Sequence, residues 1–390
     1  AAWVAIHHIA TWREPFKPAS HGPITMMPPP PLAGRWTPPS LLDCFAQADT
    51  LKESVPAVVD MLADTVLNPK FLSWELEEEK GALKAELDAA ANNPQELLTE
   101  LSNGAAFGSR SPLGKPLPCP ARNLPLITPD VLSSFVESQY VPSRMVLAAA
   151  GYDHEALVSL AESHFGSLPA GEPQRSSPVE YVGGEIRESS ASGDDMTHFA
   201  LSFKGAGWKD DDLIPLCVLN TMMGGGASFS AGGPGKGMYT RLYTNILNRY
   251  PFVTAASVFN SFYNDVGVFG VYGATSSDCM GQLVSVLCKE MAGMGSGISA
   301  EELSRAKNQL KASLVMNLES RPILLEDIGR QVLSYGAYTP AADLVAKIEK
   351  VTAADLANVA KKVISSPPSV AVYGDTTSVP RYDIIAKQFS

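Results

Sequence analysis

KGALKAEL at residues 80–87 and KNQLKASL at residues 307–314 are two copies of one pattern, K-x-x-L-K-A-x-L. A second pair follows in the same order, because ITPDVL at residues 127–132 is echoed by VTAADL at residues 351–356. The offset from residue 127 to residue 351 is nearly the same as the offset from residue 80 to residue 307. Two matches in one order at nearly one offset indicate a duplication. So long a period is typical of two homologous domains rather than of a solenoid.

The surroundings of the two copies agree with a duplication. Each copy of the second motif is followed by a helical pattern, a turn with Pro and Ser, and an apolar strand that ends in Gly, at residues 145–151 and 370–374. The helix that carries residues 307–314 opens with a capping box formed by Ser299 and Glu302. This alternation of helical periods with short strand-like runs predicts an α/β or α+β protein.

The first forty residues differ from the rest of the chain. Residues 1–40 hold nine prolines, a composition typical of an extended or irregular segment rather than of a packed core. The predicted organisation is therefore an atypical segment at 1–40, an incomplete first domain at 41–168, a linker at 169–184 and a second domain at 185–390. The linker is recognised by its Pro and Gly residues.

The repeat also predicts a deficit in the first domain. The second domain opens with a strand over residues 197–203, with Phe199, Leu201 and Phe203 on one face. Subtracting the repeat offset puts the matching strand before residue 1. We therefore expect the first domain to lack its beginning, with residues 1–40 in its place.

Composition excludes several classes of protein. The 390 residues are 45% hydrophobic, which is enough for sizeable cores, and no apolar run reaches the length of a membrane span. The net charge of −11 argues against nucleic acid as a partner, because phosphate binding needs clustered Lys and Arg. Five scattered cysteines without a CxxC motif favour a reducing compartment.

Two glutamates are the first candidates for chemistry. Glu79 and Glu86 lie two helical turns apart in a predicted helix over residues 72–90, so their carboxylates share a face. They could serve a metal site, but a solvated acidic face is the favoured interpretation. A zinc hydrolase needs two histidines beside a glutamate, as in HExxH or HxxEH, and neither motif occurs in the sequence. We therefore expect no catalytic residue and no metal site in this chain.

A glycine-rich segment is the second candidate. MGGGASFSAGGPGKG at residues 223–237 holds seven glycines. It is not a P-loop, because Ser230 stands where a Gly is needed and Lys236 is followed by Gly237 instead of Ser or Thr. It follows a helical pattern rather than a strand, which argues against a dinucleotide fold. A loop that contacts an extended peptide backbone and a plain flexible connection both remain open.

Several segments together carry a family resemblance. They are GGGASFSAGGPGKGM at 224–238, TRLYTNILNRY at 240–250, NLESRPILLEDIGRQVLSYG at 317–336, VAVYGD at 370–375, YVPSRMVLAAAGYDHEAL at 140–157 and FALSFKGAGW at 199–208. Over about residues 41–390 the chain resembles the α-type subunits of mitochondrial processing peptidase. These belong to the inverted-zincin (pitrilysin-like) peptidases and are related to core proteins of the cytochrome bc1 complex. The resemblance implies an α+β fold of two homologous domains, each a mixed β-sheet covered by helices on one face, with the first domain N-terminally incomplete.

The resemblance implies a division of labour between two chains. A β-type partner supplies the HxxEH motif and holds the zinc. The α-type chain binds no cofactor, is not itself catalytic, and recognises mitochondrial presequence peptides in the matrix. Glu86 and Glu79 match the family's downstream zinc-ligand and supporting glutamates. Counting back from Glu86, HxxEH would begin near residue 6, where Ile6, Ile9 and Ala10 stand, so both glutamates lack histidine partners.

The resemblance also implies candidate residues for substrate binding. Those of the glycine-rich loop are Gly224, Gly225, Gly226, Ser228, Phe229, Ser230, Gly232, Gly233, Gly235, Lys236 and Gly237. Because presequences are basic amphipathic helices, acidic residues are further candidates by charge alone, namely Asp210, Asp211, Asp212, Glu319, Glu326 and Asp327.

A second function follows from the same resemblance. The chain could be a structural core subunit of respiratory complex III, in contact with cytochrome bc1 subunits at the matrix face of the inner membrane, or hold both functions at once. Both functions use one fold, so the sequence leaves them open.

Overall fold

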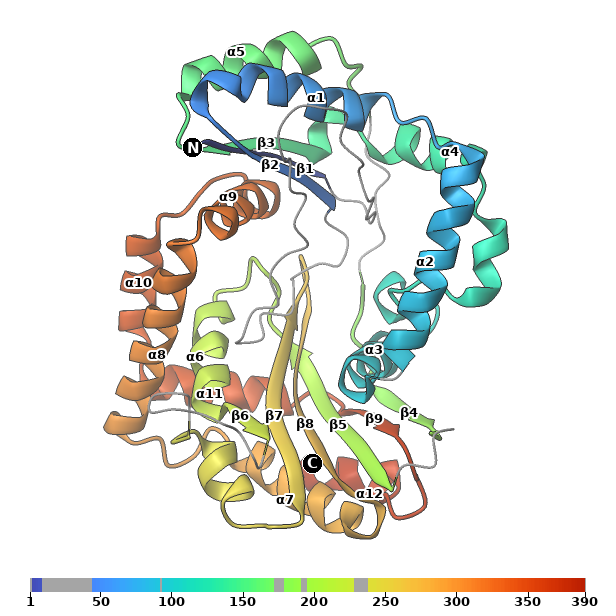
Figure 1. Cartoon of the computed structure of the whole chain (residues 1–390). Helices are drawn as coiled ribbons and strands as arrows, with labels where there is room; N and C mark the ends of the chain where they lie inside the picture. Colours follow the sequence, from blue (N-terminus) through green and yellow to red (C-terminus); the bar gives the residue numbers. More distant parts are fainter. Residues whose placement is uncertain are drawn as a thin grey trace. The chain divides into compact units, whose positions relative to one another are not determined.

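The computed structural model describes residues 2–8, 44–91, 93–171, 179–190, 195–227 and 238–389 (Figure 1). The strands are β1 Ala2–His8, β2 Cys44–Thr50, β3 Met145–Ala150, β4 Gly184–Glu188, β5 Met196–Gly205, β6 Gly225–Ala227, β7 Val253–Phe262, β8 Gly267–Ser276 and β9 Ser369–Tyr373. The helices are α1 Val55–Leu67, α2 Ser73–Ala91, α3 Pro94–Phe107, α4 Pro129–Gln139, α5 His154–Phe165, α6 Leu213–Met223, α7 Met280–Gly293, α8 Ala300–Leu318, α9 Arg321–Tyr335, α10 Ala341–Lys350, α11 Ala353–Ile364 and α12 Tyr382–Ala386.

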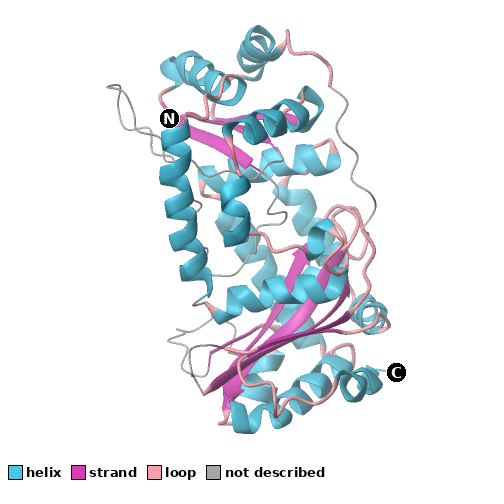
Figure 2. Ribbon diagram, turned by 90° about the vertical axis from the view of Figure 1, so that its right-hand side faces the viewer, coloured by secondary structure: helices cyan, strands magenta, loops and turns pink. Residues whose placement is uncertain are grey.

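The described residues divide into two compact units, each built from three stretches of chain. The first unit takes its residues from Ala1–Leu83, Ala121–Ser177 and Ser313–Ala341, and the second from Lys84–Pro120, Pro178–Ala312 and Ala342–Ser390. Figure 2 shows that each unit holds strands, drawn in magenta, with helices beside them. The α+β class predicted from the sequence is confirmed.

The sheet of the first unit has the strand order β2-β1-β3, with antiparallel pairing throughout the described strands. Its core forms where alternate residues of β3 meet apolar residues of α1 and α5, because side chains alternate between the two faces of a strand. The residues of this core are Ala46, Ala48, Val55, Val58, Val59, Leu62, Val66, Met145, Leu147, Ala149, Tyr152, Leu157, Leu160 and Phe165.

The sheet of the second unit is mixed and has the order β4-β9-β5-β8-β7-β6. Only β4 and β9 pair in parallel, and the other described pairs are antiparallel. Strand β5 runs without a break through Phe199, Leu201 and Phe203, so these alternate residues share one face as predicted, and all three are fully buried. Helices α6, α7 and α11 contact this sheet at β7, β8 and β5 respectively.

One helix on the second face of each sheet comes from the other half of the sequence. Helix α9 places Leu325 and Ile328 against Ala148 and Ala150 of β3 in the first unit. Helix α3 places Leu98 in a core with residues of β5, β8 and β9 in the second unit. Figure 1 shows both helices beside these strands. The compact units therefore do not coincide with the sequence repeats.

The duplication predicted from the motifs appears in the elements themselves. Helices α2 and α8 have 19 residues each, and their starts at Ser73 and Ala300 keep the offset of the first motif pair. Strands β3 and β9 start at Met145 and Ser369, which keeps the offset of the second motif pair. Helices α3 and α9 are related by the same offset as α2 and α8. The two helices that pack on the other half's sheet are therefore equivalent members of the repeat.

The structure places the deficit of the first unit differently from the prediction. Strand β1 lies between β2 and β3 and is antiparallel to both, as β5 is to β8 and β9. The counterpart of β5 is therefore Ala2–His8, and the prediction that it precedes residue 1 is wrong. The shortening falls after this strand, since β1 and β2 are joined by residues 9–43, whereas β5 and β8 are joined by the longer stretch 206–266. Residues 9–43 lie outside the described residues.

No helix in the described ranges combines the length and the apolar character needed to cross a bilayer.

Candidate functional site

The glycine-rich segment begins with a backbone conformation that glycine adopts more easily than other residues. Helix α6 ends at Met223, and Gly224 and Gly225 follow with φ angles of 59° and 117°, which disfavour any side chain. A Cβ on Gly225 would collide with the carbonyl oxygen of Ala256. This close approach lets β6 pair with β7 as the outermost described strand of the sheet.

The chain returns from the segment against the same three glycines. A Cβ on Gly224 would collide with the Thr240 side chain, and one on Gly226 would lie 3.1 Å from the Tyr243 ring. The Tyr243 hydroxyl donates a hydrogen bond to the carbonyl oxygen of Ala227 at 3.3 Å. The two flanks therefore contact each other. We call residues 224–227 and 238–243 together the loop base.

Arg241 anchors the returning flank in the second unit. Its Nε and one terminal nitrogen donate to the two carboxylate oxygens of Glu302 at 2.6 and 3.0 Å. The guanidinium also donates to the carbonyl oxygens of Gly293 (3.4 Å), Met294 (2.9 Å) and Ser296 (3.0 Å). The Arg241 and Glu302 side chains are only 11% and 18% exposed, so this is a nearly buried, bidentate pair.

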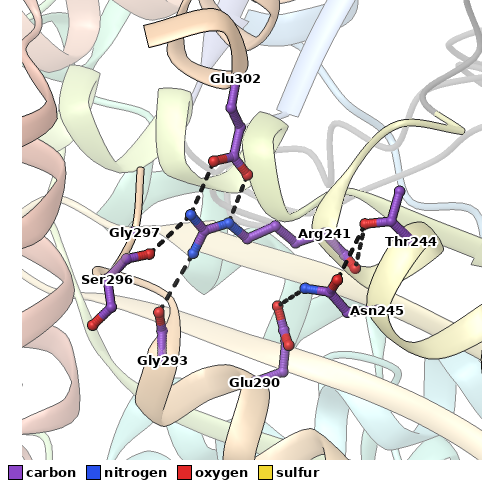
Figure 3. Close-up of a pocket in the computed structure, with 8 residues that line it drawn as sticks. All are labelled: Arg241, Thr244, Asn245, Glu290, Gly293, Ser296, Gly297 and Glu302. Atoms are coloured by element: carbon purple, nitrogen blue, oxygen red, sulfur yellow. Dashed lines mark hydrogen bonds and ion pairs between the residues drawn. The ribbon is translucent and has the colours of Figure 1, made fainter. Parts of the chain in front are cut away.

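A polar pocket of about 370 Å³ surrounds this pair (Figure 3). Its wall includes Asn245, whose side-chain amide donates to Glu290 at 2.9 Å. Asn245 lies in a single π-helical turn at Tyr243–Leu247, a rare geometry that is frequent at functional sites. The pocket lies beside the returning flank of the loop base.

The structure describes only part of the predicted substrate-binding segment. Gly224, Gly225 and Gly226 lie at the loop base. The remaining residues, which are Ser228, Phe229, Ser230, Gly232, Gly233, Gly235, Lys236 and Gly237, lie outside the described residues.

The acidic candidates fall in both units, and several already have partners. Lys362 donates to Asp212 and lies 3.8 Å from Asp210, and the hydrogen bond with Asp212 raises the pKa of this lysine. Both carboxylate oxygens of Asp327 are also occupied, since they accept hydrogen bonds from Arg330 and Gln331 within α9. Asp210 and Asp212 belong to the second unit and Asp327 to the first. Asp211 and Glu319 are exposed, and Glu326 is partly buried.

The two glutamates of α2 are the sequence candidates for a metal site. Glu79 is partly buried and Glu86 is exposed. Among the described side chains, no three His, Cys, Asp or Glu residues come together as metal ligands would. The described donors around Glu79 and Glu86 therefore do not make up a zinc site by themselves.

The sequence does not reveal Arg241 and Glu302 as a pair. One half of the capping box predicted at Ser299 and Glu302 is present, because the Glu302 backbone amide donates to the Ser299 hydroxyl at 3.1 Å. The Glu302 carboxylate, however, binds the Arg241 guanidinium, because two charge-assisted bonds are stronger than one bond to a backbone amide. The sequence offers one signal for this pair, which is an arginine shortly after the glycine-rich segment. It does not identify Glu302 as the partner, because Glu302 lies 61 residues further along the chain.

Two family descriptions match the chain. The family described as "Insulinase (Peptidase family M16)" matches residues 44–121, and "Peptidase M16 inactive domain" matches residues 126–310. The potato (Solanum tuberosum) "Mitochondrial-processing peptidase subunit alpha" is 44% identical over 345 residues, which cover 87% of this chain and 68% of that protein. The chain belongs to peptidase family M16. Its identification as a member of this family from the glycine-rich loop and the other segments that carry the resemblance is confirmed.

Further relatives in the M16 family carry the same description. An Arabidopsis thaliana protein, "Probable mitochondrial-processing peptidase subunit alpha-1, mitochondrial", is 40% identical and covers 87% of this chain and 67% of its own length. The human "Mitochondrial-processing peptidase subunit alpha" is 36% identical, with 90% and 71% covered.

The fold of this M16 chain also matches a solved structure. A chain of "Complex III2 from Candida albicans, Inz-5 bound" superposes with a TM-score of 0.83 and covers 100% of this chain and 94% of that one. Its sequence identity is 17%, so this likeness shows the fold alone.

Proposed function

We propose that the chain is the non-catalytic, substrate-recognising α-type subunit of a heterodimeric zinc endopeptidase that removes mitochondrial presequences. The observation that carries this proposal is the 44% identity to a mitochondrial-processing peptidase α subunit, which extends over 87% of the chain. The names of the relatives support a mitochondrial location. A position in the matrix is part of the proposal.

The proposal assigns hydrolysis to a β-type partner that carries HxxEH and zinc. The description of the relatives as α subunits supports a second, β-type chain in the enzyme. In this proposal the chain contributes substrate binding rather than bond cleavage. Its glycine-rich segment would place backbone N–H and C=O groups against an extended presequence, which glycine allows because no side chain blocks the approach.

The anchored loop base supports this role for the segment. Both flanks are fixed, by pairing of β6 with β7 on one side and by Arg241 on the other. A plain flexible connection between two elements does not need a bidentate buried ion pair at its end. A fixed base lowers the conformational entropy that the loop base itself would lose when a peptide binds beside it.

A photo-cross-linking experiment tests the proposal directly. A presequence peptide with a photoreactive side chain is bound to the heterodimer, with the HxxEH glutamate of the partner changed to Gln so that the peptide remains intact. We expect cross-links to residues 224–243 of this chain, which mass spectrometry of the digested complex identifies. A peptide whose Arg and Lys are replaced by Gln is the control and should label this region weakly. Cross-links that fall only on the partner contradict a recognition role.

The alternative function is a structural core subunit of respiratory complex III. The TM-score of 0.83 to a chain of complex III favours it, although that likeness concerns the fold alone. Co-migration of this chain with cytochrome b on a native gel would support the core function. Migration with the β-type partner alone would support the soluble peptidase.

A further inference from the structure

Arg241 uses its entire hydrogen-bonding capacity inside the protein. A guanidinium carries five N–H donors, and five bonds reach Glu302, Gly293, Met294 and Ser296. No donor is left for a ligand, and a positive charge would repel a basic presequence. Direct contact with substrate is therefore not the function of this side chain.

The acceptors of Arg241 all lie on one connection of the second unit. Gly293 ends α7, Met294 and Ser296 follow it, and Glu302 lies in the first turn of α8. Arg241 thus ties the returning flank of the loop base to the α7–α8 connection, as Figure 3 shows.

A second contact joins the same flank to α8. The Arg305 guanidinium lies 5.8 Å from the centre of the Tyr239 ring, and Glu301 holds Arg305 by an ion pair of 2.7 Å. Tyr239 is 72% exposed, so this contact is weaker than the buried one. The first turns of α8 therefore act as the platform for residues 239 and 241.

The anchored flank in turn holds the glycine flank. Thr240, next to Arg241, lies against Gly224. Tyr243 lies against Gly226, and its hydroxyl donates a hydrogen bond to the carbonyl oxygen of Ala227. Movement of residue 241 would displace both contacts and loosen the pairing of β6 with β7. The position of the glycine flank depends on Arg241 through this chain of contacts.

We propose that Arg241 is a positioning residue that fixes the loop base and so sets the affinity of the subunit for presequences, with Glu302 as its essential partner. The proposal rests on the proposed function, because it assumes that the segment between the two flanks contacts substrate. The alternative is that the pair stabilises the second unit and nothing more.

The same unit offers a matched control. Arg187 donates to the carboxylate of Glu185 and to the carbonyl oxygens of Thr376, Val379 and Pro380. It is the same kind of guanidinium network, and none of these partners belongs to the loop base. Arg187→Met and Arg241→Met therefore remove comparable sets of bonds, and only one of them touches the loop.

The test compares these variants in the heterodimer with an active β-type partner. Both substitutions should lower the thermal midpoint by several degrees. Only Arg241→Met should raise KM for a presequence, by about tenfold to hundredfold with kcat nearly unchanged, since a small misplacement is enough for such a loss. Only Arg241→Met should speed hydrogen exchange in residues 224–227. Arg241→Lys should not rescue KM, because an ammonium cannot reproduce the planar fork.

The outcomes separate this inference from the proposed function. Equal KM for the two Met variants, or unchanged exchange at residues 224–227 in Arg241→Met, overturns the positioning role. A variant lacking residues 228–237 that keeps the wild-type KM overturns substrate binding by the segment, whatever Arg241 does. If Arg241→Met does not fold, Glu302→Gln gives the same comparison, because it weakens the pair and keeps a side chain of equal size.

Discussion

Removal of residues 228–237 is expected to raise KM for a presequence by about tenfold to hundredfold while kcat and the heterodimer persist. Loss of two or three backbone hydrogen bonds, each worth about 0.5–1.5 kcal/mol, corresponds to such a weakening. The fold should survive, because Thr240 and Tyr243 still contact the glycine flank across the deletion. A short Gly-Ser bridge between Ala227 and Met238 closes the chain. Steady-state cleavage of a fluorogenic presequence gives KM and kcat, and gel filtration follows the heterodimer.

A replacement of the same length is the control for the deletion. A Gly-Ser segment in place of residues 228–237 keeps the chain length but removes Phe229, Lys236 and the native spacing of the glycines. If this variant keeps the wild-type KM, backbone groups suffice for binding. If it behaves as the deletion does, specific side chains are required. Loss of the heterodimer in the deletion variant would contradict the account, because the segment would then be structural.

Leu98→Ala is expected to cost about 2–5 kcal/mol of unfolding free energy, the range for a leucine truncated in a packed core. Leu98 lies on α3, in the N-terminal half of the sequence, and is 1% exposed. It packs against Ala200, Tyr272 and Ala371 from three strands of the second unit. The substitution should therefore lower the thermal midpoint of the second unit. Hydrogen exchange of β5 and β9 should become faster, although these strands lie far from Leu98 in the sequence.

Leu126→Ala is the matched control for this prediction. Leu126 is 68% exposed, so the same chemical change should alter stability by no more than about 0.5 kcal/mol. A Leu98 variant as stable as the Leu126 variant would contradict the packing of α3 on the C-terminal sheet.

The duplication could be predicted from the sequence, whereas the packing of α3 and α9 could not. The motif at residues 80–87 and its copy lie in α2 and α8, and the starts of these two helices are separated by the same offset as the motifs. A helical pattern shows which face of a helix is apolar, but it does not show which sheet that face covers. The boundary between the two units falls inside α2, at Leu83 and Lys84, so α3 begins within the second unit.

Strand β1 escapes a prediction from composition, because composition averages over a long segment. Residues 1–40 are rich in proline as a whole, yet the first proline is Pro15, and the strand Ala2–His8 lies before it. The short continuous run of apolar residues at 2–6 is a usable signal for a strand. Composition describes a segment well only when the segment has one structure throughout.

Of the candidate site, the glycine flank could be predicted and its anchor could not. Gly224 and Gly225 have backbone angles that favour glycine, so their identity carries structural information. Arg241 and Glu302 meet only because α8 lies beside the returning flank, and no local pattern records that meeting. The same applies to Lys362, whose pairing with Asp210 and Asp212 leaves these acids less available to a basic peptide.

The most direct test of the account is cleavage of a presequence by the purified chain alone, by a β-type partner carrying HxxEH alone, and by the two together. The account predicts cleavage only in the mixture, because recognition lies in this chain and the hydrolytic site in the partner. Cleavage by this chain alone would contradict it. No cleavage in any of the three would leave the structural core function as the better explanation.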